Sequence, residues 1–307
     1  MSKLLAWLQL CRFAAVFTAM ADIFLGYLLT HRDGIEDWPQ CLLLVGGSAC
    51  LYLAGMVFND VFDREIDLHE RPKRPIPSGR ISVRGATTFG AILVGTGCLL
   101  AGLVGSPSLV VAGLLVAAIF LYDGVLKATW VGPVSMGTCR FLNVMLGASA
   151  LPALDQGAAV GPAAIWKVPQ LVVAIGLGIY IVGVTWFARQ EAGQSRRVPL
   201  VGALLTVNLG LVMLISFVMH WQAPHPRSWD AAVLLGCIGM VINRRLVVAV
   251  ADPVPAKVQA SIRTMLLSLI MLDAALILFV QADRTYAFGV AMLLLPAMIL
   301  GKKLAIT

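Results

Sequence analysis

Charged side chains are scarce in this 307-residue chain. They make up 13% of the residues, whereas 59% are hydrophobic, and the mean hydropathy is +0.88. Soluble domains carry about 25% charged residues, so this composition excludes an ordinary soluble enzyme and predicts an integral membrane protein. The net charge of +7 does not indicate nucleic-acid binding, because the basic residues lie in short segments between apolar runs.

Metal-binding cysteine pairs and interdomain linkers are missing as well. The six cysteines are scattered among apolar segments without a Cys-x-x-Cys pair, and there is no histidine-rich segment to complete a zinc site. This pattern argues against both structural zinc and a disulfide framework. Because no linker divides the sequence, we expect one transmembrane domain over residues 1–307.

Long apolar runs, by contrast, follow one another along the whole chain and predict an all-helical fold. Ten runs are candidate membrane helices: Phe13–Leu29, Leu42–Val61, Ala86–Val104, Leu109–Tyr122, Val134–Leu151, Leu171–Phe187, Leu200–Met219, Ala231–Val248, Ile262–Val280 and Tyr286–Leu300. Several are shorter than the ~20 residues that a helix needs to cross a bilayer upright. We therefore expect some boundaries to shift by a few residues.

The positive charges alternate between the segments that join these runs. With the N-terminus inside, 18 of the 23 Lys and Arg residues fall in the inside segments, four fall in the outside segments, and Arg140 lies within a run. Lys and Arg prefer the cytoplasmic side of a membrane. We therefore expect the N-terminus and the polar loops to face the cytoplasm, in a bacterial inner membrane.

A stripe of acidic side chains ends the second apolar run. At about 100° per residue, its four oxygen-bearing members fall within roughly a quarter of the helix circumference; they are Asn59, Asp60, Asp63 and Asp67 (the acidic stripe). Like charges four residues apart repel each other, so the stripe is unfavourable unless a cation neutralises it. A solvated acidic cap is the alternative, but this spacing favours a metal site.

A basic, proline-interrupted segment follows the acidic stripe directly. Residues 71–80 (the basic loop) include Arg71, Lys73 and Arg74. Oxygen ligands next to such cations suit magnesium that is bound together with a phosphate group. The two segments together predict a site for a magnesium-bridged phosphate substrate.

Three charged residues lie inside predicted membrane helices, namely Asp22, Arg140 and Asp273. A charge at membrane depth costs about 2.5–3.5 kcal/mol on insertion scales, so each of them needs a partner or a cavity. Asn143 shares the helix face of Arg140. Asp22 and Arg140 either neutralise each other as a buried pair or line a cavity, and the two interpretations are compatible.

The order of these motifs resembles the UbiA superfamily of membrane prenyltransferases. The resemblance rests on the acidic stripe, on the Arg-Pro-x-Arg-Pro-x-Pro-Ser-Gly pattern of residues 71–79, and on Tyr122-x-x-x-Leu126-Lys127. The order and intervals of the helices agree along about 280 residues. The resemblance implies an all-helical bundle of about nine transmembrane helices around a central cavity, with the tenth run as an addition at the C-terminus.

The same resemblance implies that the protein transfers a prenyl group from a prenyl diphosphate to an acceptor that the sequence does not identify, within the lipid membrane, with Mg²⁺ as cofactor. The metal ligands implied are Asn59, Asp60, Asp63, Asp67 and Glu191. The implied catalytic residues are Asp63, Asp67, Lys127 and Tyr122. Contacts to the diphosphate, or to the cavity, are implied for Arg71, Lys73, Arg74, Arg140, Asn143, Arg189 and Asp22.

The second acidic motif of the superfamily is degenerate here. Over Trp186–Gly193, the single carboxylate of Glu191 stands where two or more aspartates are expected. Either one magnesium ion suffices, with Arg189, Arg196 or Arg197 supplying charge, or the protein is a catalytically weakened membrane transporter or lipid carrier. The residues around Asp22, Arg140 and Arg189 are most similar to the EboC-type UbiA-like branch.

The CDP-alcohol phosphotransferases are another class of membrane enzyme that uses clustered aspartates and magnesium. Their Asp-Gly-x-x-Ala-Arg pattern is absent, since Asp123-Gly124 is followed by Val125-Leu126-Lys127. Motif and topology therefore favour prenyl transfer.

Overall fold

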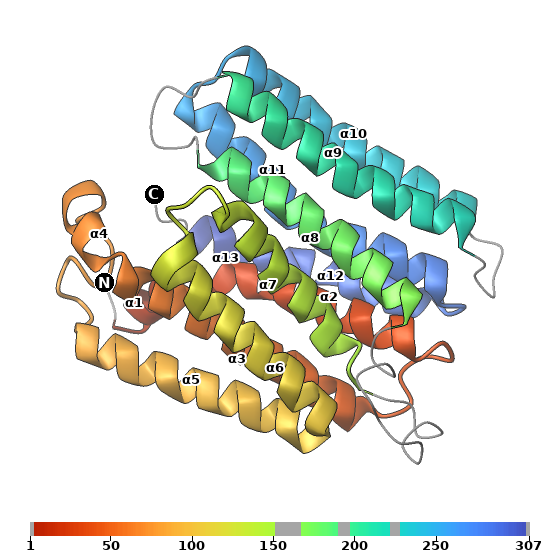
Figure 1. Cartoon of the computed structure of the whole chain (residues 1–307), viewed down its shortest axis with the longest axis horizontal. Helices are drawn as coiled ribbons and strands as arrows, with labels where there is room; N and C mark the ends of the chain where they lie inside the picture. The colour runs from red at the N-terminus through yellow and green to blue at the C-terminus, as the bar shows by residue number, and fades with distance from the viewer. Residues whose placement is uncertain (1–2, 151–166, 190–196, 222–227, 305–307) are drawn as a thin grey trace.

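The structure is a computed structural model that describes residues 3–150, 167–189, 197–221 and 228–304, and it is all-helical over these ranges (Figure 1). The helices are α1 (Lys3–Leu10), α2 (Val16–Thr30), α3 (Trp38–Phe62), α4 (Arg64–Glu70), α5 (Val83–Val104), α6 (Ser106–Leu121), α7 (Gly132–Gly147), α8 (Val168–Ala188), α9 (Arg197–His220), α10 (Ser228–Ala251), α11 (Pro255–Val280), α12 (Arg284–Met292) and α13 (Leu294–Leu304), with a 3-10 turn η1 (Phe13–Ala15) and a π-helical turn η2 (Tyr122–Leu126).

Nine helical segments in the described ranges are long and apolar enough to cross a membrane. They confirm the prediction of a polytopic membrane protein. The predicted run over 134–151 corresponds to α7, which has 16 residues and is shorter than the nine. α7 nevertheless runs between opposite ends of the bundle. At its start, Arg189, which follows α8, donates to the loop that precedes α7, and at its end Thr30 of α2 donates to the backbone oxygen of Ala148. α7 is thus a tenth crossing.

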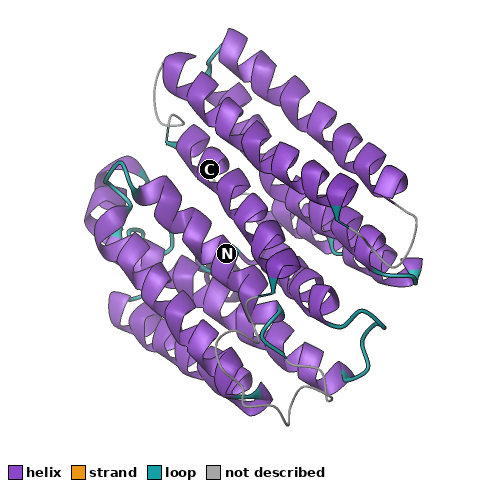
Figure 2. Cartoon of the chain, turned by 45° about the vertical axis from the view of Figure 1, so that its right-hand side comes forward, coloured by secondary structure: helices purple, strands orange, loops and turns teal. Residues whose placement is uncertain are grey.

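The long helices form a closed ring in which each packs against its neighbour in sequence. From α2 the order runs through α3, α5, α6, α7, α8, α9, α10 and α11, and α11 returns to α2. Figure 1 shows α9 and α10 along one side of the bundle and α5 along the other, and Figure 2 shows the same bundle turned by 45°. α2 lies innermost, since it also packs against α7. The C-terminal crossing, formed by α12 and α13, packs outside the ring against α11.

Local sequence signals set several helix ends. Asp37 caps α3, its side chain accepting a hydrogen bond from the backbone N–H of Gln40 at 2.9 Å, and Ser82 caps α5 in the same way through Gly85 at 3.1 Å. These caps start α3 and α5 three or four residues earlier than their apolar runs predict. A helix can extend beyond the apolar run because its first turn lies in the polar interface.

Two glycines allow α2 and α7 to approach closely. An ideal Cβ on Gly147 would lie 2.5 Å from the carbonyl oxygen of Ile23 and 2.8 Å from its Cα, and Gly26 faces the backbone of α7 in the same manner. Small residues at such crossings let membrane helices pack backbone to backbone.

We expect Gly147→Ala to destabilise the protein by about 1–3 kcal/mol, because the added methyl group must separate α2 from α7. The measurement is the thermal unfolding midpoint of the purified protein in detergent. Gly236→Ala is the matched control, since a Cβ at Gly236 in α10 meets no atom within 4 Å. Equal midpoints for the two variants would contradict the close approach.

Candidate functional site

The predicted polar residues gather at the end of the bundle where α3 stops and α4 begins. Asp63 sits at this junction with φ −81° and ψ 0°, in the bridge region of backbone conformation that many active-site residues occupy. The i to i+4 hydrogen bonds continue through it, from Asp63 N–H to Asn59 and from Asp67 N–H to Asp63. The chain therefore bends without losing its helical register. The acidic stripe extends across the bend, with Asn59, Asp60 and Asp67 buried.

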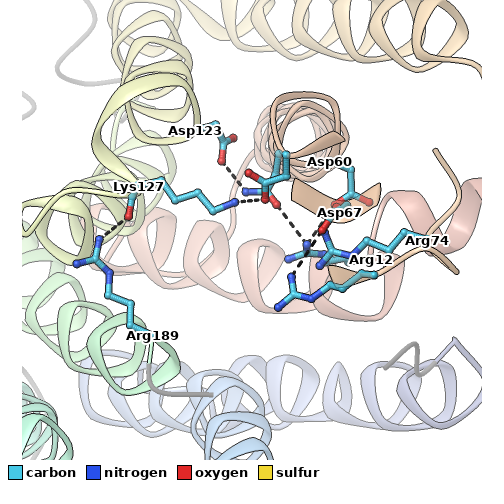
Figure 3. Close-up of polar contacts among 10 residues, drawn as sticks. Arg12, Asp60, Asp67, Arg74, Asp123, Lys127 and Arg189 are labelled. Atoms are coloured by element: carbon cyan, nitrogen blue, oxygen red, sulfur yellow. Dashed lines mark hydrogen bonds and ion pairs between the residues drawn. The ribbon is translucent and has the colours of Figure 1, made fainter. Parts of the chain in front are cut away.

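Each carboxylate of the acidic stripe pairs with a cation from another segment (Figure 3). Arg74 of the basic loop bonds to Asp67 at 2.6 Å and to Asp60 at 3.1 Å. The ammonium group of Lys127, which follows η2, contacts the Asp63 carboxylate. Pairing with several cations is what a stripe of like charges requires.

The other basic-loop residues lie at the edge of the stripe. Arg71 is 4.0 Å from Asp67, and the side chain of Lys73 is exposed. Residues 70–74 line an open pocket of about 290 Å³. Arg80 holds the loop in place, because it donates to the backbone oxygen of Lys73 at 2.6 Å and to the side chain of Gln9 in α1 at 2.8 Å.

Arg12 belongs to this cluster, although no motif or helical spacing predicted it. Its side chain donates to Asn59 Oδ1 at 3.2 Å and to Asp60 Oδ1 at 3.3 Å. Its backbone is left-handed, with φ 44° and ψ 46°, and in the described ranges it is the one residue other than glycine with a positive φ. Such a conformation is unfavourable for an arginine, and strain of this kind is concentrated at functional sites.

The thiol of Cys11, next to Arg12, is not a second reactive group at this site. Burial, reinforced by the Asp60 carboxylate, raises the pKa of Cys11 to about 11. At neutral pH the Cys11 thiol is therefore protonated, and it is neither a good nucleophile nor a metal ligand.

Asp123 is a second residue that the sequence analysis missed. Its Oδ1 accepts a hydrogen bond from the Asn59 side-chain amide at 2.7 Å. Asp123 lies in η2, a π-helical turn that continues α6 and closes with a bond from Lys127 N–H to Tyr122 O at 2.8 Å. π-helical turns are frequent at functional sites. Tyr122 is buried at the first position of this turn.

Arg189 contacts the backbone around Lys127 rather than the side chains of the acidic stripe. Its guanidinium donates to the backbone oxygens of Lys127 and Thr129, both at 2.5 Å, and not to a carboxylate of the acidic stripe (Figure 3). The end of α8 is thus connected to the turn that carries Lys127. Glu191, the predicted ligand from the second motif, lies outside the described residues.

Three polar residues of the predicted membrane helices, Asp22, Arg140 and Asn143, form a separate cluster. Arg140 Nε lies 2.8 Å from Asp22 Oδ2, and Asn143 donates to the same oxygen at 2.8 Å. This confirms the predicted buried pair. Asn143 also accepts a bond from Ser48 at 2.6 Å, and Ser48 precedes Asn59 by eleven positions in α3. At 1.5 Å per residue the cluster lies ~16 Å below the acidic stripe.

The oxygen donors of the acidic stripe suit magnesium, which takes hard oxygen ligands. In the described part of the chain, no three His, Cys, Asp or Glu side chains converge around one position. One or two carboxylates of the acidic stripe could therefore contact one metal ion in this conformation, and they would not fill its coordination sphere. Magnesium sites of this type are completed by substrate phosphates and water.

Comparisons with known proteins agree with this architecture. A digeranylgeranylglyceryl phosphate synthase from Metallosphaera sedula is 35% identical over 142 residues, which are 46% of this chain and 50% of the relative. A protoheme IX farnesyltransferase from Francisella tularensis subsp. novicida is 37% identical over 97 residues, 30% of this chain and 34% of the relative. The chain thus matches about half, or less, of the length of these curated relatives.

Structural similarity extends over nearly the whole chain. The structure of a UbiA homolog from Archaeoglobus fulgidus bound to GPP and Mg²⁺ superposes with a TM-score of 0.61 at 16% identity, covering 94% of this chain and 99% of that one. At this identity the likeness shows the fold alone. The sequence pattern of the UbiA prenyltransferase family matches residues 19–253. This chain therefore belongs to the UbiA prenyltransferase family.

Proposed function

We propose that the protein transfers a prenyl group from a prenyl diphosphate to an acceptor inside the membrane, in a reaction that depends on Mg²⁺. The observation that carries the proposal is the alternation of carboxylates and cations at one end of the bundle, where Arg12, Arg74 and Lys127 each pair with the acidic stripe. These pairs can exchange partners. With a diphosphate and magnesium bound, the carboxylates would hold the metal and the cations would contact the phosphate oxygens.

Magnesium, when bound, neutralises charge on the diphosphate and so favours its departure. Asn59, Asp60, Asp63 and Asp67 are the residues that would hold it. The A. fulgidus homolog of the same fold is bound to GPP and Mg²⁺, which supports the choice of magnesium as the metal. Glu191 is proposed as a further ligand on the sequence alone.

The cations have the main catalytic task. As the allylic C–O bond breaks, negative charge accumulates on the departing diphosphate, and Lys127, Arg71, Lys73 and Arg74 stabilise this charge from fixed positions. The acceptor then forms its bond to the positively charged carbon and gives up a proton. Tyr122 is buried in the turn that precedes Lys127, and in this proposal its ring stabilises the carbocation through its π electrons.

Arg189 acts in this proposal by fixing the backbone around Lys127. Asp22, Arg140 and Asn143 lie ~16 Å deeper, so we assign them to the part of the site that would hold the prenyl chain or the acceptor rather than the diphosphate. We further propose that residues 1–307 form one UbiA-like domain, with its site and N-terminus on the cytoplasmic face of a bacterial inner membrane.

The acceptor differs among relatives of this fold. Two curated relatives are named for a digeranylgeranylglyceryl phosphate and a protoheme IX product, and each matches half or less of its length. Neither acceptor transfers to this chain by similarity. The EboC-type branch is a prediction that rests on the residues around Asp22, Arg140 and Arg189.

A transporter or lipid carrier is the second candidate function. The charged cluster at membrane depth favours it, because intramembrane ionisable residues often mark transport pathways. The geometry at the acidic stripe favours the enzyme, since a carrier of neutral lipids has no need for alternating carboxylates and cations at one end of the bundle.

The deciding experiment is an assay of the purified protein in detergent, where no gradient can drive transport. We expect diphosphate release from radiolabelled prenyl diphosphates of several chain lengths in the presence of Mg²⁺ and a mixture of aromatic and glycerol-based acceptors. Chelation with EDTA should stop the release and added Mg²⁺ should restore it. If no substrate releases diphosphate while prenyl lipids still bind, the carrier function stands instead.

A further inference from the structure

Two side chains of the acidic stripe connect the end of α3 to the turn that follows α6. Asn59 meets Asp123 at 2.7 Å, and one helical turn further along, Asp63 meets Lys127. Both pairs are 64 positions apart in sequence, so two residues four apart at the end of α3 and its cap face two residues four apart just after α6. Asp123 lies in the π-helical turn η2 and Lys127 follows it directly, and Figure 3 shows both side chains reaching toward the acidic stripe from one side.

The contact with Asp123 determines which way the Asn59 amide points. An ionised carboxylate only accepts hydrogen bonds, so the NH₂ end of the amide must face Asp123. The amide oxygen is then turned to the opposite side, where it accepts a bond from Arg12 at 3.2 Å. Only that oxygen can bind a hard cation. A reversed amide would present its NH₂ group to the metal and its oxygen to a carboxylate.

We infer that Asp123 is a positioning residue for metal binding, which holds Asn59 Oδ1 toward the acidic stripe. This inference rests on the proposed function and deepens it. The second acidic motif, at Trp186–Gly193, has one carboxylate, that of Glu191. Asp123 adds another negative charge next to the acidic stripe, and it comes from η2, between α6 and α7. Partners that orient a ligand typically change metal affinity by about 10- to 100-fold when they are removed.

The test exchanges the two side chains. We expect Asp123→Asn to raise the dissociation constant of Mn²⁺, used as a paramagnetic probe with inorganic diphosphate, by about 10- to 100-fold, because an amide at position 123 no longer selects one orientation of Asn59. Asn59→Asp alone places two carboxylates face to face. The double variant Asn59→Asp, Asp123→Asn restores an amide-to-carboxylate bond in the reverse sense, so Mn²⁺ affinity should recover to within a few-fold of wild type.

Electron paramagnetic resonance of free Mn²⁺ provides the readout on the full-length protein, and a thermal unfolding midpoint is recorded for each variant. Glu65→Gln is the matched control, since Glu65 is an exposed carboxylate of α4 that pairs only with Arg64 in the described structure. An unchanged dissociation constant for Asp123→Asn, or a lowered midpoint without any change in Mn²⁺ affinity, would overturn the inference while leaving the proposed function intact. Absence of Mn²⁺ binding by the wild-type protein would overturn both.

Discussion

An Asp63→Ala, Asp67→Ala double variant is expected to release diphosphate at least about 10²–10³-fold more slowly than the wild-type protein, which is the scale of losing one preorganised electrostatic group at a catalytic site. The two carboxylates lie one helical turn apart across the bend between α3 and α4. Asp67 is 1% exposed, and Arg74 and Arg71 both approach it. No solvent-exposed acid can replace a group in that position.

The loss has two physical sources. Without the carboxylates, only Asn59 and Asp60 of the proposed ligands in the described site would be left to hold magnesium. In addition, Lys127 loses its partner Asp63, and Arg74 keeps only Asp60 of its two carboxylate partners. Both cations are then held less firmly beside the departing diphosphate. Since both effects act on the transition state, kcat should fall more than the KM for the prenyl diphosphate rises.

The measurement is diphosphate release at saturating Mg²⁺, with Mn²⁺ binding as a second readout. The more conservative pair Asp63→Asn, Asp67→Asn keeps the size of both side chains and should show the same loss. Glu65→Gln, on the same short helix and exposed, should retain wild-type activity. Full activity in the double alanine variant would refute the metal role of the acidic stripe.

The topology could be predicted because two independent signals agree. Apolar runs give the positions of the crossings, and the alternation of basic residues between them tests the count. Even the short helix α7 was found in this way. The ends of helices were less predictable, because α3 and α5 begin at side-chain caps in the polar interface, several residues before their apolar runs.

Only the part of the site that is local in sequence could be predicted. The acidic stripe is local in sequence, so helical periodicity alone brings its members together. Arg12 and Asp123 are 47 and 64 positions from Asn59 in sequence. A left-handed turn places the first and a π-helical turn the second, and both are exceptions to regular helix geometry that no periodic pattern announces. Their positions follow from how the segments before α2 and after α6 pack against α3.

The membrane interior provides the largest expected effect on stability. Replacing Arg140 by methionine, which keeps an unbranched apolar stem without the charge, should destabilise the protein by about 3–5 kcal/mol, the usual consequence of removing one partner of a buried pair. Asp22 would keep Asn143 as a donor but lose the cation 2.8 Å away. Asp273 aggravates the loss, because its two carboxyl oxygens have no hydrogen-bond donor in the described ranges and it too is fully buried.

Removing both partners should be far less damaging than removing one. In Asp22→Leu, Arg140→Met no charge of the pair remains, and replacing a buried ion pair by apolar side chains of similar volume is often neutral or stabilising. Asp273 stays in the double variant without Arg140, so the loss of stability that remains is the one that Asp273 causes. The measurement is a double-mutant cycle on the thermal unfolding midpoint in detergent, with Arg64→Met on the exposed surface as the control. If the double variant were as unstable as the sum of the two single variants, Asp22 and Arg140 would not be acting as a pair. A stable double variant that has lost prenyl transfer would instead show that this pair is retained for the cavity and not for the fold.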